Sequence, residues 1–132
     1  MPLSVSSTLP GETELIVSRI IDCALTVHRA LGPGFLESIY TTALCLELSA
    51  NGLAFERERA VSVDYRGVSI GGQRVDLIVA SAVVIEVKAV ARLDPVFHAK
   101  LISYLRTTKP RVGLLINFNT SLLKEGIQRV VL

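Results

Sequence analysis

The sequence has few of the features that mark metal-motif, disulfide-rich, membrane or secreted proteins. Its only two cysteines, Cys23 and Cys45, have the spacing of no metal motif and form no CxxC pair. Both fall at apolar positions of helical patterns, so we expect buried free thiols. No apolar run approaches the roughly 20 residues that cross a bilayer. The N-terminus also lacks the charged start and apolar block of a signal peptide, so we expect a cytoplasmic protein.

The chain also lacks a strong excess of charge. Fourteen Lys and Arg residues against 12 Asp and Glu give a formal net charge of +2. That value does not identify a nucleic-acid binder, so any phosphate-binding surface must come from local clustering of charge. Hydrophobic residues make up 50% of the sequence, which is rich for a small protein that covers its own surface. We therefore expect some apolar surface to meet a partner, in the simplest case a homodimer.

The length of 132 residues is close to the commonest size for one domain. Residues 1–12 mix Ser, Thr, Pro and Gly without periodicity and predict a flexible tail before a single domain at 13–132. Apolar residues then recur at three- and four-residue steps, predicting a helix that ends at residues 32–34. A second helix is expected over about 35–50, closed by Asn51-Gly52.

After residue 52 the pattern changes from helical to strand-like. Residues 61–66 alternate between apolar and polar, as in a strand with one wet face. Gly67 and Gly71-Gly72 predict turns around a short segment. Two further strands, 74–80 and 83–89, are close enough in sequence to form an antiparallel hairpin.

The last third of the chain predicts a helix between two strands. Asp94 fits the N-cap of a helix that has Pro95 at its first position and runs to about residue 107. Residues 112–118 are apolar without alternation, as expected for a strand covered on both faces, so a parallel crossover connects it to the 83–89 strand. A short strand is expected at 127–132. The predicted order is helix, helix, three strands, helix, strand, in a mixed α/β fold.

Asp76, Glu86 and Lys88 interrupt the two strands of strongest β-forming composition. Glu86 and Lys88 are two residues apart and therefore project from one face. An acid and a lysine on a central strand are costly to desolvate unless they pair or hold a ligand. Two carboxylates brought together repel, and a divalent cation such as Mg²⁺ relieves that repulsion. A structural salt bridge from Lys88 to either carboxylate is the alternative, and these three charges alone do not separate the two.

The hairpin loop decides whether the two carboxylates share a face. A three-residue loop, Ala80 to Ala82, would set Asp76 opposite Glu86. A two-residue turn would instead pair Asp76 with Val87 and send the carboxylates to opposite faces. We predict an odd loop or a bulge, with Asp76, Glu86 and Lys88 pointing together toward Glu37.

The ordered set of motifs resembles a known family. Asp76, nine intervening residues and Glu86-Val87-Lys88 resemble the PD-(D/E)XK nuclease signature, and Gly34-Phe35-Leu36-Glu37-Ser38-Ile39-Tyr40 resembles the motif that names the GxxExxY family within that superfamily. The likeness extends over nearly the whole chain after residue 12. It implies a restriction-endonuclease-like core, a mixed β-sheet flanked by helices.

The resemblance implies roles for individual residues. Asp76, Glu86 and the Val87 carbonyl would hold Mg²⁺ or Mn²⁺, and Lys88 would be the catalytic lysine. Glu37 would be the acid of the first conserved helix, although an acid in a first helical turn is also favourable by itself. Substrate contacts would come from Tyr40, Lys100 and Tyr104. Tyr40 either lines the cleft or packs, and Lys100 stands where relatives carry glutamine, which makes activity less certain than the metal site.

The sequence thus predicts a metal-dependent nuclease acting on DNA or RNA, without distinguishing between the two. One alternative is a catalytically silent nucleic-acid-binding or dimerisation module that keeps the fold. Another is a metal-dependent hydrolase of a smaller phosphate ester. Retention of Asp76, Glu86 and Lys88 together argues against the silent module.

Overall fold

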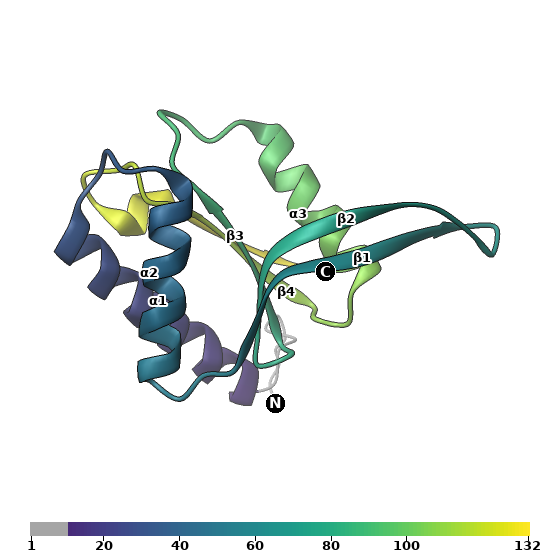
Figure 1. The fold of residues 1–132 in the computed structure, drawn as a ribbon, viewed down its shortest axis with the longest axis horizontal. Helices are drawn as coiled ribbons and strands as arrows, with labels where there is room; N and C mark the ends of the chain where they lie inside the picture. Colours follow the sequence, from purple (N-terminus) through teal and green to yellow (C-terminus); the bar gives the residue numbers. More distant parts are fainter. Residues whose placement is uncertain (1–10) are drawn as a thin grey trace.

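The computed structural model describes residues 11–132 as a five-stranded mixed sheet flanked by helices (Figure 1). In chain order the elements are α1 (Gly11–Leu31), α2 (Glu37–Ala50), β1 (Phe55–Tyr65), β2 (Val68–Val79), β3 (Val83–Lys88), α3 (Pro95–Thr107), β4 (Val112–Asn117), the 3-10 helix η1 (Leu123–Gly126) and β5 (Ile127–Val131). The expected α/β class is confirmed, and the architecture is consistent with a restriction-endonuclease-like fold. The predicted tail at 1–12 lies outside the described residues except for Gly11 and Glu12, which belong to α1.

The strands lie in the order β1-β2-β3-β4-β5, and only β3 and β4 run parallel. Helix α3 makes the crossover between these two strands, as the sequence predicted. Asp94 caps it, because its Oδ1 accepts the Val96 N–H at 2.9 Å. None of the helices in residues 11–132 is long and apolar enough to span a membrane.

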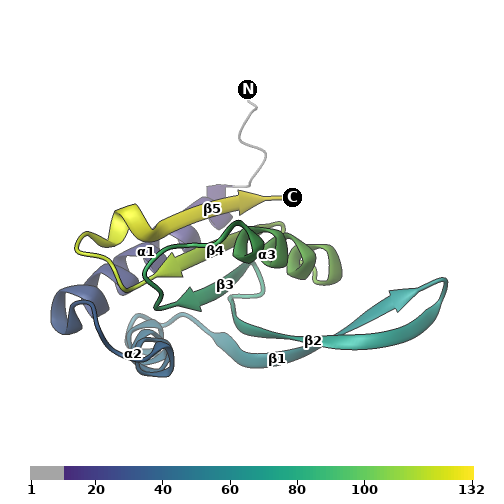
Figure 2. The ribbon, with the colours of Figure 1, turned by 90° about the horizontal axis from the view of Figure 1, so that it is seen from above.

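Two hydrophobic cores lie on opposite faces of the sheet. Helices α1 and α2 cover one face, where Ile85 and Val87 of β3 are buried. Helix α3 covers the other face and packs Leu101 against Val84 and its neighbours (Figure 2). A Cβ at Gly113 of β4 would lie 2.8 Å from a Leu101 methyl group, so this glycine sets the close approach of α3 to the sheet. Both free cysteines are buried, as expected.

Strands β1 and β2 extend beyond the body as a long hairpin arm (Figures 1 and 2). Gly67 turns the chain with φ +78°, as predicted. The turn predicted at Gly71-Gly72 is wrong, because both residues lie inside β2. Gly71 pairs with Val63, directly before a register shift in β1. Glycine in a strand often marks such an irregularity, and Gly71-Gly72 indicated this register shift and not a turn.

The β2–β3 hairpin has the predicted odd loop. Val79 pairs with Val83, and the Ala82 N–H donates to the Val79 carbonyl at 2.9 Å. Ala80 and Ser81 turn the chain with φ of 53° and 54°. This register sends Asp76 and Glu86 to the same face of the sheet.

Candidate active site

Asp76 lies where strands β2 and β3 stop pairing. The last backbone pair of the two strands is Leu77 and Ile85. Asp76 is the neighbour of Leu77 on β2, and Glu86 is the neighbour of Ile85 on β3. Asp76 Oδ2 then accepts the Val87 N–H at 2.9 Å. The aspartate side chain thus takes over where the ladder ends, and its carboxylate is fixed against β3. The Val87 side chain points into the opposite core, so only its backbone can serve this site.

Glu86 is a buried carboxylate with an incomplete set of partners. Only 4% of its surface is exposed. Its Oε2 lies 3.5 Å from Lys88 Nζ, whereas its Oε1 is buried and has no hydrogen-bond partner within residues 11–132. Buried carboxylate oxygens are normally paired, hydrogen-bonded or bound to a metal. The salt bridge foreseen from the sequence is therefore present, but it satisfies only half of this carboxylate.

The site carries more negative than positive charge. Burial and then the negative charge of Asp76 raise the pKa of Glu86 to about 7, and Lys88 opposes this rise. Lys88 pairs with Glu86 and Asp76 adds a second negative charge near it, so a further positive charge would stabilise the two ionised carboxylates.

Glu37, the first residue of α2, is affected by the charges of Lys88 and Asp76. It is exposed, yet partial burial raises the pKa of its carboxyl group, Lys88 lowers it and Asp76 raises it. The described part of the chain contains no group of three or more His, Cys, Asp or Glu side chains that could hold a metal ion. The charges of Lys88 and Asp76 thus reach Glu37, but in the described residues Glu37 does not form a three-carboxylate metal group with Asp76 and Glu86.

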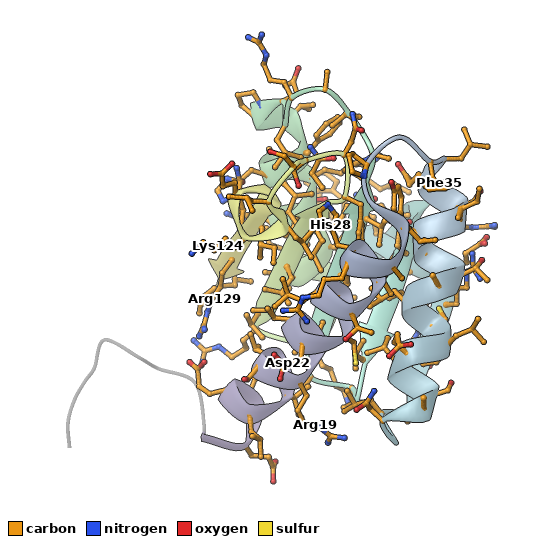
Figure 3. All side chains as sticks on the ribbon, turned by 90° about the vertical axis from the view of Figure 1, so that its left-hand side faces the viewer. Arg19, Asp22, His28, Phe35, Lys124 and Arg129 are labelled. Atoms are coloured by element: carbon orange, nitrogen blue, oxygen red, sulfur yellow. The ribbon has the colours of Figure 1, made fainter. Side chains whose placement is uncertain are left out.

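Tyr40 has a structural position, and packing is the better of its two predicted roles. Its side chain is fully buried, its hydroxyl donates to the Gly32 carbonyl at 2.5 Å and accepts the Phe35 N–H at 3.1 Å. Its ring stacks on Phe118 with 4.7 Å between centroids. A direct substrate contact by Tyr40 is not compatible with this burial. The residue instead holds the loop that leads into Glu37 through its contacts with Gly32 and Phe35; Phe35 is labelled in Figure 3, just before α2.

Helix α3 supplies the other wall of the site. Lys88 Nζ lies 4.4 Å from the centre of the Phe97 ring, a cation–π distance. Tyr104 is buried, and burial together with Glu86 and Asp76 raises its pKa to about 12. It is therefore a neutral phenol beside the carboxylates, without the open surface of a substrate contact. Lys100 is exposed, and its spacing from Phe97 and Tyr104 places it on their side of the helix.

Sequence reasoning missed Phe97 and gave Asn117 no role. Asn117, at the end of β4, pairs with Lys88 in the sheet register. Its Oδ1 accepts the Val90 N–H at 3.0 Å and its Nδ2 donates to the Val90 carbonyl at 2.9 Å, which ties the chain leaving β3 to β4. The sequence did mark Asn117, because it is the first polar residue after the apolar residues 112–116. Phe97 had only the helical spacing to mark it.

The comparisons with known proteins identify the family. The family model described as the PD-(D/E)XK nuclease superfamily matches residues 14–130, which include Glu37, Asp76, Glu86 and Lys88. Neither a search of curated proteins nor a search of solved structures gave a match. Nucleases of this superfamily generally use divalent metal ions. With most of its length matched, the chain belongs to the PD-(D/E)XK nuclease superfamily.

Proposed function

We propose that this protein is a metal-dependent nuclease that hydrolyses phosphodiester bonds of DNA or RNA at Asp76, Glu86 and Lys88. The observation that carries the proposal is the buried Glu86 carboxylate, whose Oε1 has no partner in residues 11–132 while burial and then Asp76 raise its pKa. A buried carboxylate with an unsatisfied oxygen is destabilising in the absence of a ligand. Membership of the superfamily supports the same chemistry.

The residues present fit a hard divalent cation. Asp76, Glu86 and the Val87 carbonyl would offer oxygen ligands only, as Mg²⁺ and Mn²⁺ prefer. The two thiols lie in the other core, away from the site. When bound, such an ion supplies positive charge that neutralises the carboxylates and polarises the scissile phosphate.

The protein's own groups then orient the reaction. Lys88 Nζ lies between Glu86 and the Phe97 ring, where it would donate a hydrogen bond to the attacking water and offset charge that develops on the phosphate. The water oxygen forms the new bond to phosphorus and loses a proton to solvent, the bond to the leaving sugar oxygen breaks, and that oxygen takes up a proton from solvent. Glu37 would accept a hydrogen bond from water at the edge of the site.

Two finer features remain part of the proposal. Residues 34–40 carry the Gly, Glu and Tyr of the GxxExxY pattern, and we assign the chain to that family. A homodimer follows from the high apolar content, and the exposed Tyr65, Val68 and Ile70 on the β1–β2 arm are apolar surface of the kind that a partner covers. Light scattering of the purified protein would give its mass in solution.

A cleavage assay tests the function. Mixed DNA and RNA substrates are incubated with Mg²⁺ or Mn²⁺, with and without a chelator. Cleavage by the wild type that disappears with chelator and in Lys88→Ala, but not in the exposed control Lys124→Ala, supports the proposal. Cleavage that survives both would overturn it, and binding without cleavage would favour the silent module.

A further inference from the structure

A large cleft lies between β1 and the end of α3. Its volume is about 860 Å³, and its charged and hydroxyl lining includes Arg59, Ser62, Asp64, Ser81, Arg106 and Lys109. Neither Asp76, Glu86 nor Lys88 lines it. It is therefore a cavity separate from the three residues of the candidate active site.

The cleft concentrates the positive charge of the protein. Arg59, Arg106 and Lys109 line it against the single carboxylate of Asp64, which leaves a net charge of +2. The whole chain also has a formal net charge of +2, so the remaining residues balance to zero. This is the local clustering that a phosphate-binding surface requires in a protein of small net charge.

The cations of the cleft are available to a ligand. Arg106 and Lys109 are exposed, and their side chains make no ion pair or hydrogen bond within the described residues. Arg59 pairs with Glu56 at 2.5 Å, but both side chains are half exposed. Exposed ion pairs contribute little stability, so a phosphate group could replace the glutamate.

The position of the cleft relates it to the candidate active site. Tyr104 packs in the same core cluster as Val84 of β3, two residues before Glu86, and Arg106 follows two residues later on α3. On β2, Ile78 lines the cleft and is two residues from Asp76. Strand β1, which continues into the projecting arm, forms the opposite wall (Figure 1). A chain that passes the carboxylates can therefore continue along the same helix and strand into the cleft.

We infer that this cleft binds the sugar–phosphate backbone of nucleic acid next to the bond that is cleaved. The identity of the ligand rests on the proposed nuclease function. Arg, Lys and Ser side chains are common phosphate contacts, and binding them to phosphates releases counterions from the nucleic acid. The competing explanation is that Arg106 only complements the dipole at the C-terminus of α3, which predicts an effect on stability and none on binding.

The test measures binding in a Lys88→Ala background, where cleavage is removed. The substitutions Arg106→Gln and Lys109→Gln are combined, because glutamine retains part of each aliphatic stem and removes the charge. The matched control is Lys124→Gln, an exposed lysine on η1 (Figure 3). Fluorescence anisotropy with labelled DNA and RNA oligonucleotides is recorded at several salt concentrations.

The double substitution should weaken binding by about one to two orders of magnitude near 0.1 M salt and reduce the salt slope by about 2. The control should bind like the Lys88→Ala parent, and all three proteins should melt at the same temperature. Equal affinity of the double variant and the control would overturn the inference. If the wild type cleaves nothing but binding still depends on the cleft, the nuclease proposal fails and the cleft remains a nucleic-acid-binding site. If the wild type cleaves and the double variant binds unchanged, the nuclease proposal stands and the inference about the cleft fails.

Discussion

The Glu86 carboxylate lies in a core that does not fully accommodate its charge. Its pKa rises from the ordinary value of 4.5 to about 7 because of burial and the nearby Asp76. The folded protein therefore binds this proton more tightly than the unfolded chain does. In the metal-free protein, the resulting stability is fully present below pH 4.5 and is lost as the pH rises through about 7.

We predict that metal-free wild type loses on the order of 2–3 kcal/mol relative to Glu86→Gln between pH 4.5 and 8. Urea unfolding of both proteins in the presence of a chelator measures this difference, and the comparison cancels the titration of other groups. Glutamine has nearly the same shape as glutamate but no charge, so its curve should be flatter. Parallel curves of unfolding free energy against pH for the two proteins would show that folding does not raise the pKa of Glu86.

The side-chain amide of Asn117 ties the chain that leaves β3 to β4. Asn117→Ala would leave the Val90 N–H and carbonyl without their side-chain partner. We expect a loss of about 2–3 kcal/mol in the free energy of unfolding and a lower turnover, since Lys88 precedes this segment. Asn119→Ala is the control, because only the backbone N–H of Asn119 enters the network. Similar effects of the two substitutions would show that the Asn117 clamp has no special role.

The loop before α2 depends on the Tyr40 hydroxyl. Tyr40→Phe keeps the stack on Phe118 but removes the bonds to Gly32 and Phe35. We expect a loss of about 1–2 kcal/mol in stability, measured by denaturant unfolding. Tyr65→Phe, on the exposed arm, should change stability by less than about 0.5 kcal/mol. If Tyr40→Phe is as neutral as this control, the loop is held by other contacts.

The two hairpins show which features of an element can be predicted from sequence. Side-chain alternation and the need to bring Asp76 and Glu86 to one face required an odd loop, and Val79 does pair with Val83 across three residues. Gly71-Gly72 is different, because glycine favours both turns and strand irregularities. Only the pairing of Gly71 with β1 distinguishes a turn from a strand irregularity, and strand pairing is a tertiary property that the local sequence does not contain. The burial of Tyr40 and Tyr104 likewise depends on loop and helix placement that local pattern does not contain.

At the scale of the whole molecule, composition gave the net charge but could not show its distribution. Ten Arg and Lys residues from 57 to 111 are spread in sequence, and the fold brings three of them to one cleft. The order of elements was predictable, because each has its own periodicity or cap.

A bound divalent ion should stabilise the whole fold. At about 100 times the dissociation constant, Mg²⁺ or Mn²⁺ should add about 2.7 kcal/mol and raise the melting temperature by several degrees. Asp76→Asn should abolish this response, while its amide oxygen can still accept the Val87 N–H. A wild-type melting curve that does not change at millimolar metal would count against the site.

The most direct test of the account compares the effect of Lys88→Ala on turnover with its effect on binding. In the proposed mechanism Lys88 Nζ acts on water and on charge that develops during the reaction, so kcat should fall by about 10²–10⁴. The Kd for the same oligonucleotide, measured without cleavage in a chelator, should change by less than about threefold. Melting curves of both proteins control for folding. Equal losses in kcat and affinity would reduce Lys88 to a phosphate contact, and unchanged cleavage would contradict a nuclease centre at Asp76, Glu86 and Lys88.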